Sequence, residues 1–309
     1  MKPKAFITGV GGFVGPYLAR HLVKNGFEVF GIDRKGSKIE AYVVEKCDVT
    51  DYNSLFKIVN RAKPDCIFHL AGQSSVAKSW DEPELTQRVN VGGTKNLFQA
   101  VAAARIKPKI LLVSSAEIYG IPKKVPITEE HPVSPISPYG ETKLEQERLA
   151  MEFISKSKMQ IIIARSFNHT GPGQPPDFVC SNFAMQIAKI EKGKQPPVIR
   201  VGDRKVKRDF SDVRDIVSAY LLLIEKGVSG EVYNVCSGRA FTIGEILDKL
   251  LKLSNIKVKV EPDPSKMKSS VVPVLQGDNS KLVGATGWKQ AISLDSTLSE
   301  LLDYWRKHA

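Results

Sequence analysis

Short apolar runs alternate with longer mixed segments over the first half of the chain. The runs are typical of buried strands, and the segments between them have the apolar spacing of helices that pack on one face. The expected strands are Lys4–Thr8, Glu28–Ile32, Ala41–Cys47, Asp65–Leu70, Lys109–Val113 and Gln160–Ala164, and the expected helices are Gly12–Asn25, Asn53–Arg61, Thr86–Ala104 and Pro138–Ser157. This alternation predicts an α/β fold with a Rossmann-type doubly wound parallel sheet.

The pattern loosens after about residue 166, where proline and glycine become frequent. Residues 171–176 read Gly-Pro-Gly-Gln-Pro-Pro, and further helices are expected near Ser181–Lys192 and Thr242–Leu253. We therefore expect residues 1–165 to form the Rossmann domain and residues 166–309 to form mainly a smaller C-terminal substrate-binding lobe. Part of the later chain, about residues 210–240, is expected to return to the first domain.

A glycine-rich turn follows the first expected strand directly. Gly9, Gly12 and Gly15 stand where a tight turn, a closely approaching pyrophosphate and close helix–strand packing would each exclude a side chain. A tight turn that binds nothing would use the same glycines. The second expected strand, however, runs into Asp33, where an acid binds the ribose hydroxyls of an adenine dinucleotide. Together the two features predict NAD(P) binding.

These residues leave the choice of dinucleotide open. Asp33 favours NADH because a carboxylate repels a 2′-phosphate, whereas Arg34 attracts that phosphate and favours NADPH. The remaining cofactor contacts are expected from the start of the first helix and from the loops after the third and fourth strands: Phe13, Val14, Asp48, Val49, Leu70, Ala71 and Gly72.

A tyrosine and a lysine share one face of the helix that begins at Pro138. Ser137 and Pro138 are typical of a helix start, and Lys143 follows Tyr139 by four residues. A phenol has an ordinary pKa of about 10. We expect a neighbouring ammonium and a positively charged nicotinamide to lower the pKa of Tyr139, so that it exchanges a proton with a substrate oxygen. The fifth strand runs into Ser115, whose hydroxyl is expected to bind the same oxygen. For the spacing alone, a surface Tyr–Lys pair is the alternative.

Four motifs together resemble the extended short-chain dehydrogenase/reductases. They are TGVGGFVG at residues 8–15, SSAEIYG at 114–120, YGETK at 139–143 and DFSDVRDIV at 209–217, and the resemblance covers nearly the whole chain. It implies that Ser115, Tyr139 and Lys143 form a catalytic triad, with Tyr139 beside the cofactor and Lys143 on the nicotinamide ribose. It also implies a homodimer built from two helices of each subunit.

Within that family, residues 165–174 and 208–210 look like the branch that acts on GDP-mannose derivatives. The resemblance implies that Asn168 contacts the diphosphate, Val179 and Asn182 the guanine, and Arg208 a phosphate. An ion pair with a neighbouring aspartate is the alternative for Arg208. Lys268 stands where relatives commonly offer an arginine, so a point charge replaces a forked donor there.

The same resemblance implies NADPH- or NADH-dependent reduction of the C4 ketone of GDP-4-keto-6-deoxy-D-mannose to GDP-D-rhamnose. Glu117 keeps a second activity open, because 4,6-dehydratases of nucleotide sugars place a glutamate two residues after the catalytic hydroxyl to abstract the C5 proton. GDP-mannose 4,6-dehydration is therefore the first alternative, and nucleotide-sugar 4-epimerisation the second. The glycine motif GVGGFVG favours the reductase. A non-catalytic NAD(P)-sensing protein would be expected to lack the triad.

Charge and composition narrow the expected partners. The 309 residues include 45 Lys+Arg and 33 Asp+Glu, a net charge of +12 that attracts anions such as a nucleotide sugar. The basic residues are spread over the chain, so nucleic acid is not an expected partner. We expect no metal site, no membrane span and a cytoplasmic protein with reduced thiols at its four separated cysteines, which are Cys47, Cys66, Cys180 and Cys236.

Overall fold

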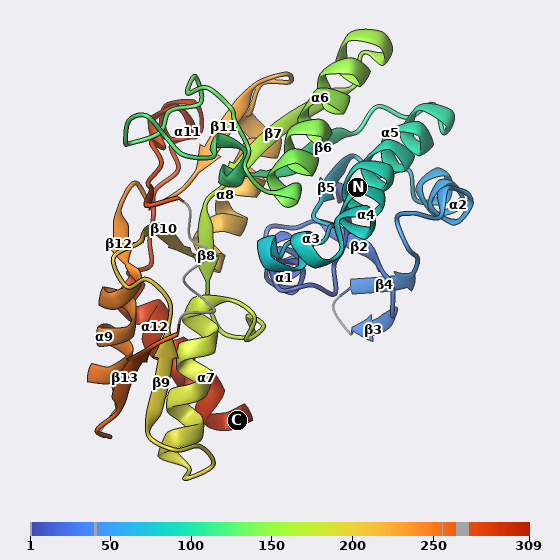
Figure 1. Cartoon of the computed structure of the whole chain (residues 1–309). Helices are drawn as coiled ribbons and strands as arrows, with labels where there is room; N and C mark the ends of the chain where they lie inside the picture. The colour runs from blue at the N-terminus through green and yellow to red at the C-terminus, as the bar shows by residue number, and fades with distance from the viewer. Residues whose placement is uncertain (1, 40–41, 255, 264–271) are drawn as a thin grey trace.

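A parallel sheet forms the larger part of the computed structural model, which describes residues 2–39, 42–254, 256–263 and 272–309 (Figure 1). Its strand order is β11-β7-β6-β5-β1-β2-β4-β3, and β3 alone pairs in the antiparallel sense. The order reverses between β1 and β5, as in a doubly wound fold. The predicted Rossmann-type sheet is confirmed. The strands are β1 (Lys4–Thr8), β2 (Glu28–Asp33), β3 (Ser37–Ile39), β4 (Tyr42–Lys46), β5 (Cys66–His69), β6 (Lys109–Ser115), β7 (Gln160–Ser166) and β11 (Val232–Val235).

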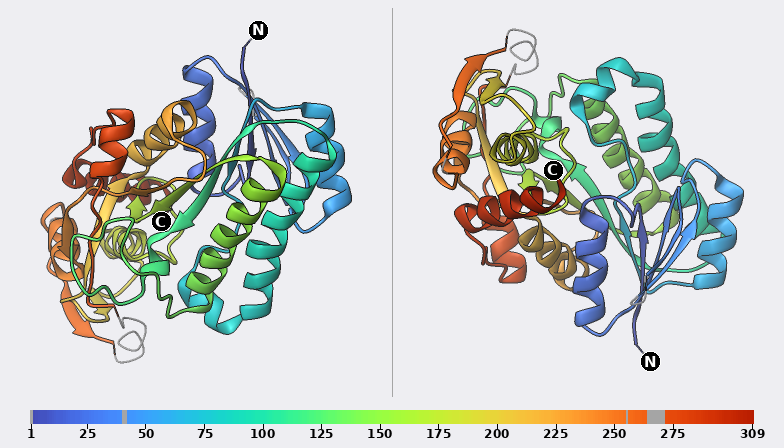
Figure 2. Two further views of the ribbon diagram at one scale, coloured as in Figure 1. Left: turned by 90° about the horizontal axis from the view of Figure 1, so that it is seen from above. Right: turned by 90° about the horizontal axis from the view of Figure 1, so that it is seen from below.

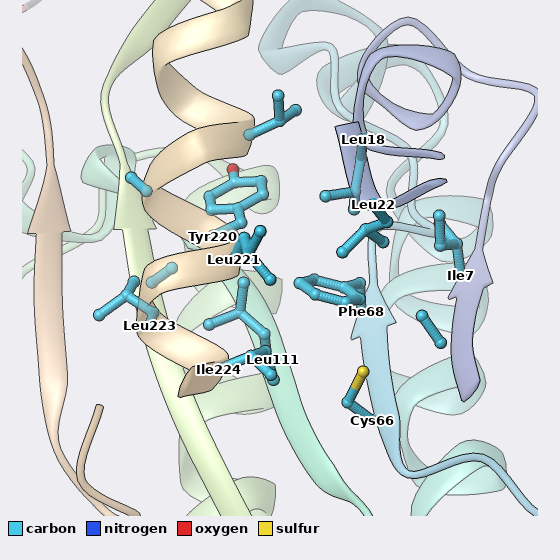
Figure 3. Close-up of a cluster of buried hydrophobic side chains, with 14 of the residues drawn as sticks. Ile7, Leu18, Leu22, Cys66, Phe68, Leu111, Tyr220, Leu221, Leu223 and Ile224 are labelled. Carbon is cyan, nitrogen blue, oxygen red and sulfur yellow. The ribbon is translucent and has the colours of Figure 1, made fainter. Parts of the chain in front are cut away.

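Helices cover both faces of this sheet (Figure 2). Helices α1 (Val14–Lys24) and α8 (Val213–Lys226) pack on one face, and α2 (Tyr52–Ala62), α5 (Gly93–Ala103) and α6 (Pro138–Ser157) pack on the other. Figure 3 shows the first of these interfaces, where Tyr220 and Ile224 of α8 face Leu111 of β6 and Phe68 of β5. Such burial on both faces explains why these strands are nearly continuous apolar runs.

The second part of the molecule is built on a separate core. Helices α7 (Val179–Glu191), α9 (Ile243–Lys252) and α12 (Leu294–His308) pack around the strands β9 (Val198–Val201) and β10 (Lys207–Asp212). β13 (Lys259–Pro262) pairs with β9, and β10 pairs with β8 (Asn168–Thr170), β12 (Ala240–Thr242) and β14 (Val274–Leu275); α11 (Ser280–Thr286) packs on α8. Two elements that lie among these in the sequence belong to the first part of the molecule: β11 is a strand of the large sheet, and α8 packs on it. The domain boundary at residue 165 stays a prediction.

The segment expected as one helix over Thr86–Ala104 is divided in the structure. α4 (Pro83–Gln87) runs into a π-helical turn, η1 (Arg88–Gly92), before α5 begins. The buried Asn90 amide in this turn accepts from the backbone N–H of Gln73 at 2.8 Å and donates to the Thr142 hydroxyl at 3.0 Å. Tertiary hydrogen bonds thus favour the wider turn. The helices α3 (Val76–Asp81), η2 (Ala116–Tyr119), α8, α11 and α12 were also not predicted from the sequence.

A buried ion pair holds α6 against β6 and β7. Arg165 Nη2 lies 2.8 Å from Glu147 Oε2, and the two side chains are 8% and 7% exposed. Arg165 also donates to the Tyr119 hydroxyl at 3.0 Å, and the Ser114 hydroxyl donates to Glu147. Since each charge is desolvated, each depends on its partners for compensation.

We expect Arg165→Met to lower the free energy of unfolding by about 3–5 kcal/mol, because it leaves the Glu147 carboxylate buried without its counter-ion. Urea denaturation would measure the loss. The matched control is Lys156→Met, which breaks the exposed Lys156–Glu152 pair on the same helix and should cost less than about 1 kcal/mol. Equal losses in the two variants would contradict the importance of the buried pair.

Candidate active site

The turn between β1 and α1 has no room for side chains at two of its glycines. Gly9 has φ +73°, and a Cβ there would lie 2.8 Å from the Cα of Ala71. A Cβ on Gly15 would lie 2.3 Å from the carbonyl oxygen of Val10, so α1 packs directly on its own turn. Gly12 and Phe13 complete the turn, and α1 begins at Val14. The exposed N–H groups of such a turn can bind a pyrophosphate.

Asp33 lies beside this turn at the end of β2. A Cβ on Gly11 would lie 2.7 Å from the carboxyl carbon of Asp33. The carboxylate accepts from the backbone N–H of Lys35 at 3.0 Å, and the neighbouring Arg34 is exposed. An acid and an arginine therefore both stand beside the glycine turn, at the carboxyl end of β2.

The loops after β4 and β5 play different parts. Asp48 accepts from the backbone N–H and the hydroxyl of Thr50, at 2.9 and 2.8 Å, so its carboxylate stabilises its own turn. Val49 is buried, and its Cγ2 would lie 2.6 Å from a Cβ on Gly93. The structure thus gives Asp48 and Val49 local partners that hold the loop itself.

The loop Leu70–Gly72 lies between the glycine turn and α6. Ala71 closes on Gly9, and a Cβ on Gly72 would lie 2.9 Å from Asn90 Oδ1 and 3.9 Å from Lys143 Nζ. The lack of a side chain at residue 72 leaves the space beside the lysine open. The glycine turn, Asp33 and this loop together form a surface that fits a dinucleotide, and Lys143 lies at one end of it.

The three candidate catalytic side chains are brought together at the carboxyl end of β6. Ser115, Tyr139 and Lys143 are all buried, and the Ser115 and Tyr139 hydroxyls are hydrogen-bonded to each other. Lys143 Nζ donates to the carbonyl oxygen of Val113 at 2.8 Å and lies 5.8 Å from the centroid of the Tyr139 ring. A surface Tyr–Lys pair is therefore excluded.

The expected lowering of the tyrosine pKa is wrong in this structure. Burial raises the pKa of Tyr139, Glu117 raises it further, and only the hydrogen bond with Ser115 opposes the shift. The physical reason is that the phenolate would lose its hydration, while the Lys143 ammonium is directed at a backbone carbonyl. Burial also lowers the pKa of Lys143 to about 8, against the opposing charge of Glu147.

The charges of Glu117 and Arg208 influence each other. Burial raises the pKa of the Glu117 carboxyl, and the Arg208 guanidinium opposes that shift. Arg208 Nη1 donates to the carbonyl oxygens of Lys207 and Val272, each at 2.9 Å. The aspartates considered as its ion-pair partners are bound elsewhere, Asp209 by Ser237 and Asp212 by Arg214.

The other predicted substrate contacts are less closely grouped. Asn168 pairs in register with Phe210 of β10, two residues from Arg208. Val179 is the first residue of α7, and the Asn182 amide donates to the carbonyl oxygen of Pro176 at 2.9 Å. The fourth, Lys268, lies outside the described residues.

Sequence reasoning missed three residues that shape the site. Asn90 joins the loop after β5 to α6, as described above. The hydroxyl of Ser79 in α3 accepts from the backbone N–H of Tyr139 at 3.1 Å. His69 ends β5, where it is fully buried between two threonines. No local spacing marks these residues, because their partners come from distant segments.

The described residues contain no group of three or more His, Cys, Asp or Glu side chains arranged to hold a metal ion. Within the same residues, no helix is long and apolar enough to cross a membrane.

A family model described as GDP-mannose 4,6 dehydratase matches residues 6–301. The chain belongs to this family. The family name describes common ancestry and not the reaction of each member, because the relatives of this chain include reductases and epimerases as well as dehydratases. The predicted place among the extended short-chain dehydrogenase/reductases, in the nucleotide-sugar branch, is confirmed.

Several relatives are similar over nearly their whole length. GDP-6-deoxy-D-mannose reductase of Pseudomonas aeruginosa is 34% identical, covering 99% of this chain and 98% of its own. Human GDP-mannose 4,6 dehydratase is 29% identical, covering 97% and 91%. Among solved structures, RMD from P. aeruginosa complexed with NADPH has a TM-score of 0.90 at 33% identity, covering 100% and 99%. UDP-glucose 4-epimerase from Thermotoga maritima with UDP-glucose has a TM-score of 0.88 at 28% identity, covering 99% of both chains.

The pKa of Lys143 should limit activity at alkaline pH, and its dependence on Glu147 can be tested. If the ammonium is required, activity falls as the pH rises through about 8, where the lysine loses its proton. Glu147→Gln removes the charge that favours the ammonium and should move this basic limb to lower pH. Arg165→Met leaves the Glu147 charge uncompensated and should move it to higher pH.

The pH dependence of kcat/KM in the three proteins measures both shifts. Glu152→Gln on the same helix is the control and should leave the limb in place. Shifts in the same direction, or none, would show that the limb does not report Lys143.

Proposed function

We propose that this protein reduces the C4 ketone of GDP-4-keto-6-deoxy-D-mannose to GDP-D-rhamnose with NADPH or NADH. One observation carries the proposal. Ser115, Tyr139 and Lys143 are buried together near a glycine turn of the kind that binds dinucleotides. Similarity to a GDP-6-deoxy-D-mannose reductase over 98% of that enzyme's length supports the choice of substrate.

The protonation of Tyr139 suits reduction. A raised pKa keeps the phenol protonated at neutral pH, so it can give its proton to the C4 oxygen. NAD(P)H, when bound, supplies the hydride that reaches C4. Ser115 donates to the same oxygen and orients it, and Lys143 stabilises the phenolate left after proton transfer. The phenolate then regains its proton from water, and the alcohol is the product.

The remaining polar groups suit a nucleotide diphosphate. Arg208 is a forked, permanently charged donor anchored by two backbone carbonyls, and we assign it to a phosphate. Asn168 lies on the neighbouring strand, and we assign it to the diphosphate; Val179 and Asn182 on α7 are assigned to the guanine. Asp33 and Arg34 act in opposite directions on a 2′-phosphate, so both dinucleotides should support turnover.

Glu117 supports a second candidate, GDP-mannose 4,6-dehydration. Its carboxyl is half-buried beside Tyr139, and its raised pKa suits a general base. The reductase is favoured because the reductase relative is 34% identical, whereas the human dehydratase is 29% identical and extends beyond the alignment.

The assembly and location of the protein are also proposals. We propose a homodimer through the helices expected over Thr86–Ala104 and Pro138–Ser157, which lie side by side as α5 and α6 on one face of the sheet. A cytoplasmic location is supported by the supply of reduced nicotinamide cofactor there and by four buried free cysteines.

Tyr139→Phe should lower the turnover of ketone reduction by about 10²–10⁴-fold, the usual cost of losing a general acid. NADPH affinity should stay within about threefold, because the ring and the Lys143 position are kept. Nicotinamide absorbance measures turnover, and fluorescence titration measures binding. Near-normal turnover in the variant would remove Tyr139 from the mechanism.

Glu117→Gln separates the two candidate functions. In a reductase it should keep ketone reduction within about tenfold of wild type, roughly 1.4 kcal/mol of transition-state stabilisation, because no C5 proton is removed. The wild-type protein, given GDP-mannose and oxidised cofactor, should form little 4-keto-6-deoxy sugar by NMR. Rapid dehydration of GDP-mannose that Glu117→Gln abolishes would overturn the reductase and establish the dehydratase.

A further inference from the structure

His69 occupies a fully buried position between the cofactor loops and the catalytic helix. It is the last residue of β5, in register with Thr8 at the end of β1, immediately before Gly9. Its side chain is 1% exposed and lies on the face of the sheet that α5 and α6 cover. A buried polar side chain of this kind is stable only when each of its groups is hydrogen-bonded.

The partners of the imidazole define its tautomer. Thr94 donates its hydroxyl proton to the carbonyl oxygen of Asn90 at 2.7 Å, so its oxygen can only accept from His69 Nε2, at 2.9 Å. The Nε2 atom therefore carries the proton. Nδ1 then accepts from the Thr8 hydroxyl at 2.7 Å. The assignment follows from donor and acceptor complementarity.

The chain of hydrogen bonds continues at both ends. The Thr8 oxygen accepts from the backbone N–H of Ala71 at 3.2 Å, and Ala71 is the residue that closes on Gly9. At the other end, the Gln146 amide of α6 donates to the Thr94 hydroxyl. Gln146 lies one turn after Lys143 on the same helix. One continuous chain thus joins β1, β5, α5 and α6.

The same surroundings exclude a protonated imidazole. Burial and the charge of Lys143 lower the pKa of His69 to about 3. A second N–H would also face the Thr8 hydroxyl, which would have to give up its role as donor. His69 is therefore neutral at all pH values at which the protein would work. It serves as a hydrogen-bonding connector and not as an acid–base group.

We propose that His69 is a positioning residue that couples the wall of the cofactor site, Thr8 and Ala71, to the helices that carry Asn90 and Lys143. The inference rests on the proposed function only as far as NAD(P) binding. The coupling acts through neutral hydrogen bonds. Breaking either the Thr8–His69 or the His69–Thr94 bond should release the cofactor-site wall in the same way, and so weaken cofactor binding by the same route.

A double-mutant cycle tests this coupling. Thr8→Val and Thr94→Val preserve shape and remove one link each, and their side chains touch His69 from opposite sides. The readout is the Kd for NADPH, measured by nicotinamide fluorescence. We expect the double variant to bind at least about threefold more tightly than the product of the two single losses predicts, because the first substitution already breaks the chain.

The same cycle in a His69→Leu background is the decisive control. In that background, the fold-losses in NADPH affinity caused by the two threonine substitutions should multiply to within about twofold, since His69 no longer connects them. Ile67→Val, on the same strand and the same face of the sheet, controls for lost packing and should leave the coupling unchanged. If His69→Leu does not fold, the cycle in the native background decides the question alone.

The outcomes separate the two proposals. If the losses of NADPH affinity in the two single variants simply multiply in the native background, the role of His69 is overturned. The proposed function then still stands, because the wild-type protein binds NADPH. Coupling that is present in a protein unable to reduce the keto sugar supports His69 and overturns the proposed substrate. A wild-type chain that binds neither NADPH nor NADH overturns both.

Discussion

Desolvated charge on α6 is the constraint around which this molecule is arranged. The helix carries Lys143 and Glu147 one turn apart, both buried, and the carboxylate is balanced by Arg165 from β7. A helix with buried charges cannot slide or rotate on the sheet without leaving one of them unpaired. Because Tyr139 belongs to the same helix, its distance from Ser115 on β6 is fixed by the same pair.

Burial also decides how the candidate acid and base groups behave. Spacing alone suggested an ammonium that lowers the pKa of a phenol, but both groups are removed from water and each is pushed toward its neutral form. The site therefore holds a protonated tyrosine and a lysine that needs the Glu147 charge to stay cationic. This arrangement suits proton donation by Tyr139. A second carboxylate, Glu117, favours the same protonated form of the phenol.

The fold was predictable where one physical signal dominated. Strands buried on both faces produced apolar runs that matched β1, β2, β5, β6 and β7 closely, and the Ser137–Pro138 start located α6 to the residue. Asp48, expected among the cofactor contacts, accepts from Thr50 in its own turn, and its contact with a cofactor stays a prediction. His69, Asn90 and Arg165 could not be assigned from the sequence, since their roles depend on partners 17 to 61 residues away.

The π-helical turn over Arg88–Gly92 sets a limit on how this chain can change. Such a turn contains one residue more than the regular helix that would replace it. Removing a residue there would relieve the local distortion and would suit the isolated helix better. The wider turn absorbs its extra residue locally, so the buried face of α5, with Leu97, Phe98 and Val101, would stay against the sheet. The loss would fall on Asn90, whose amide joins the loop after β5 to α6 only from this turn. The local irregularity should therefore persist among descendants that keep these hydrogen bonds.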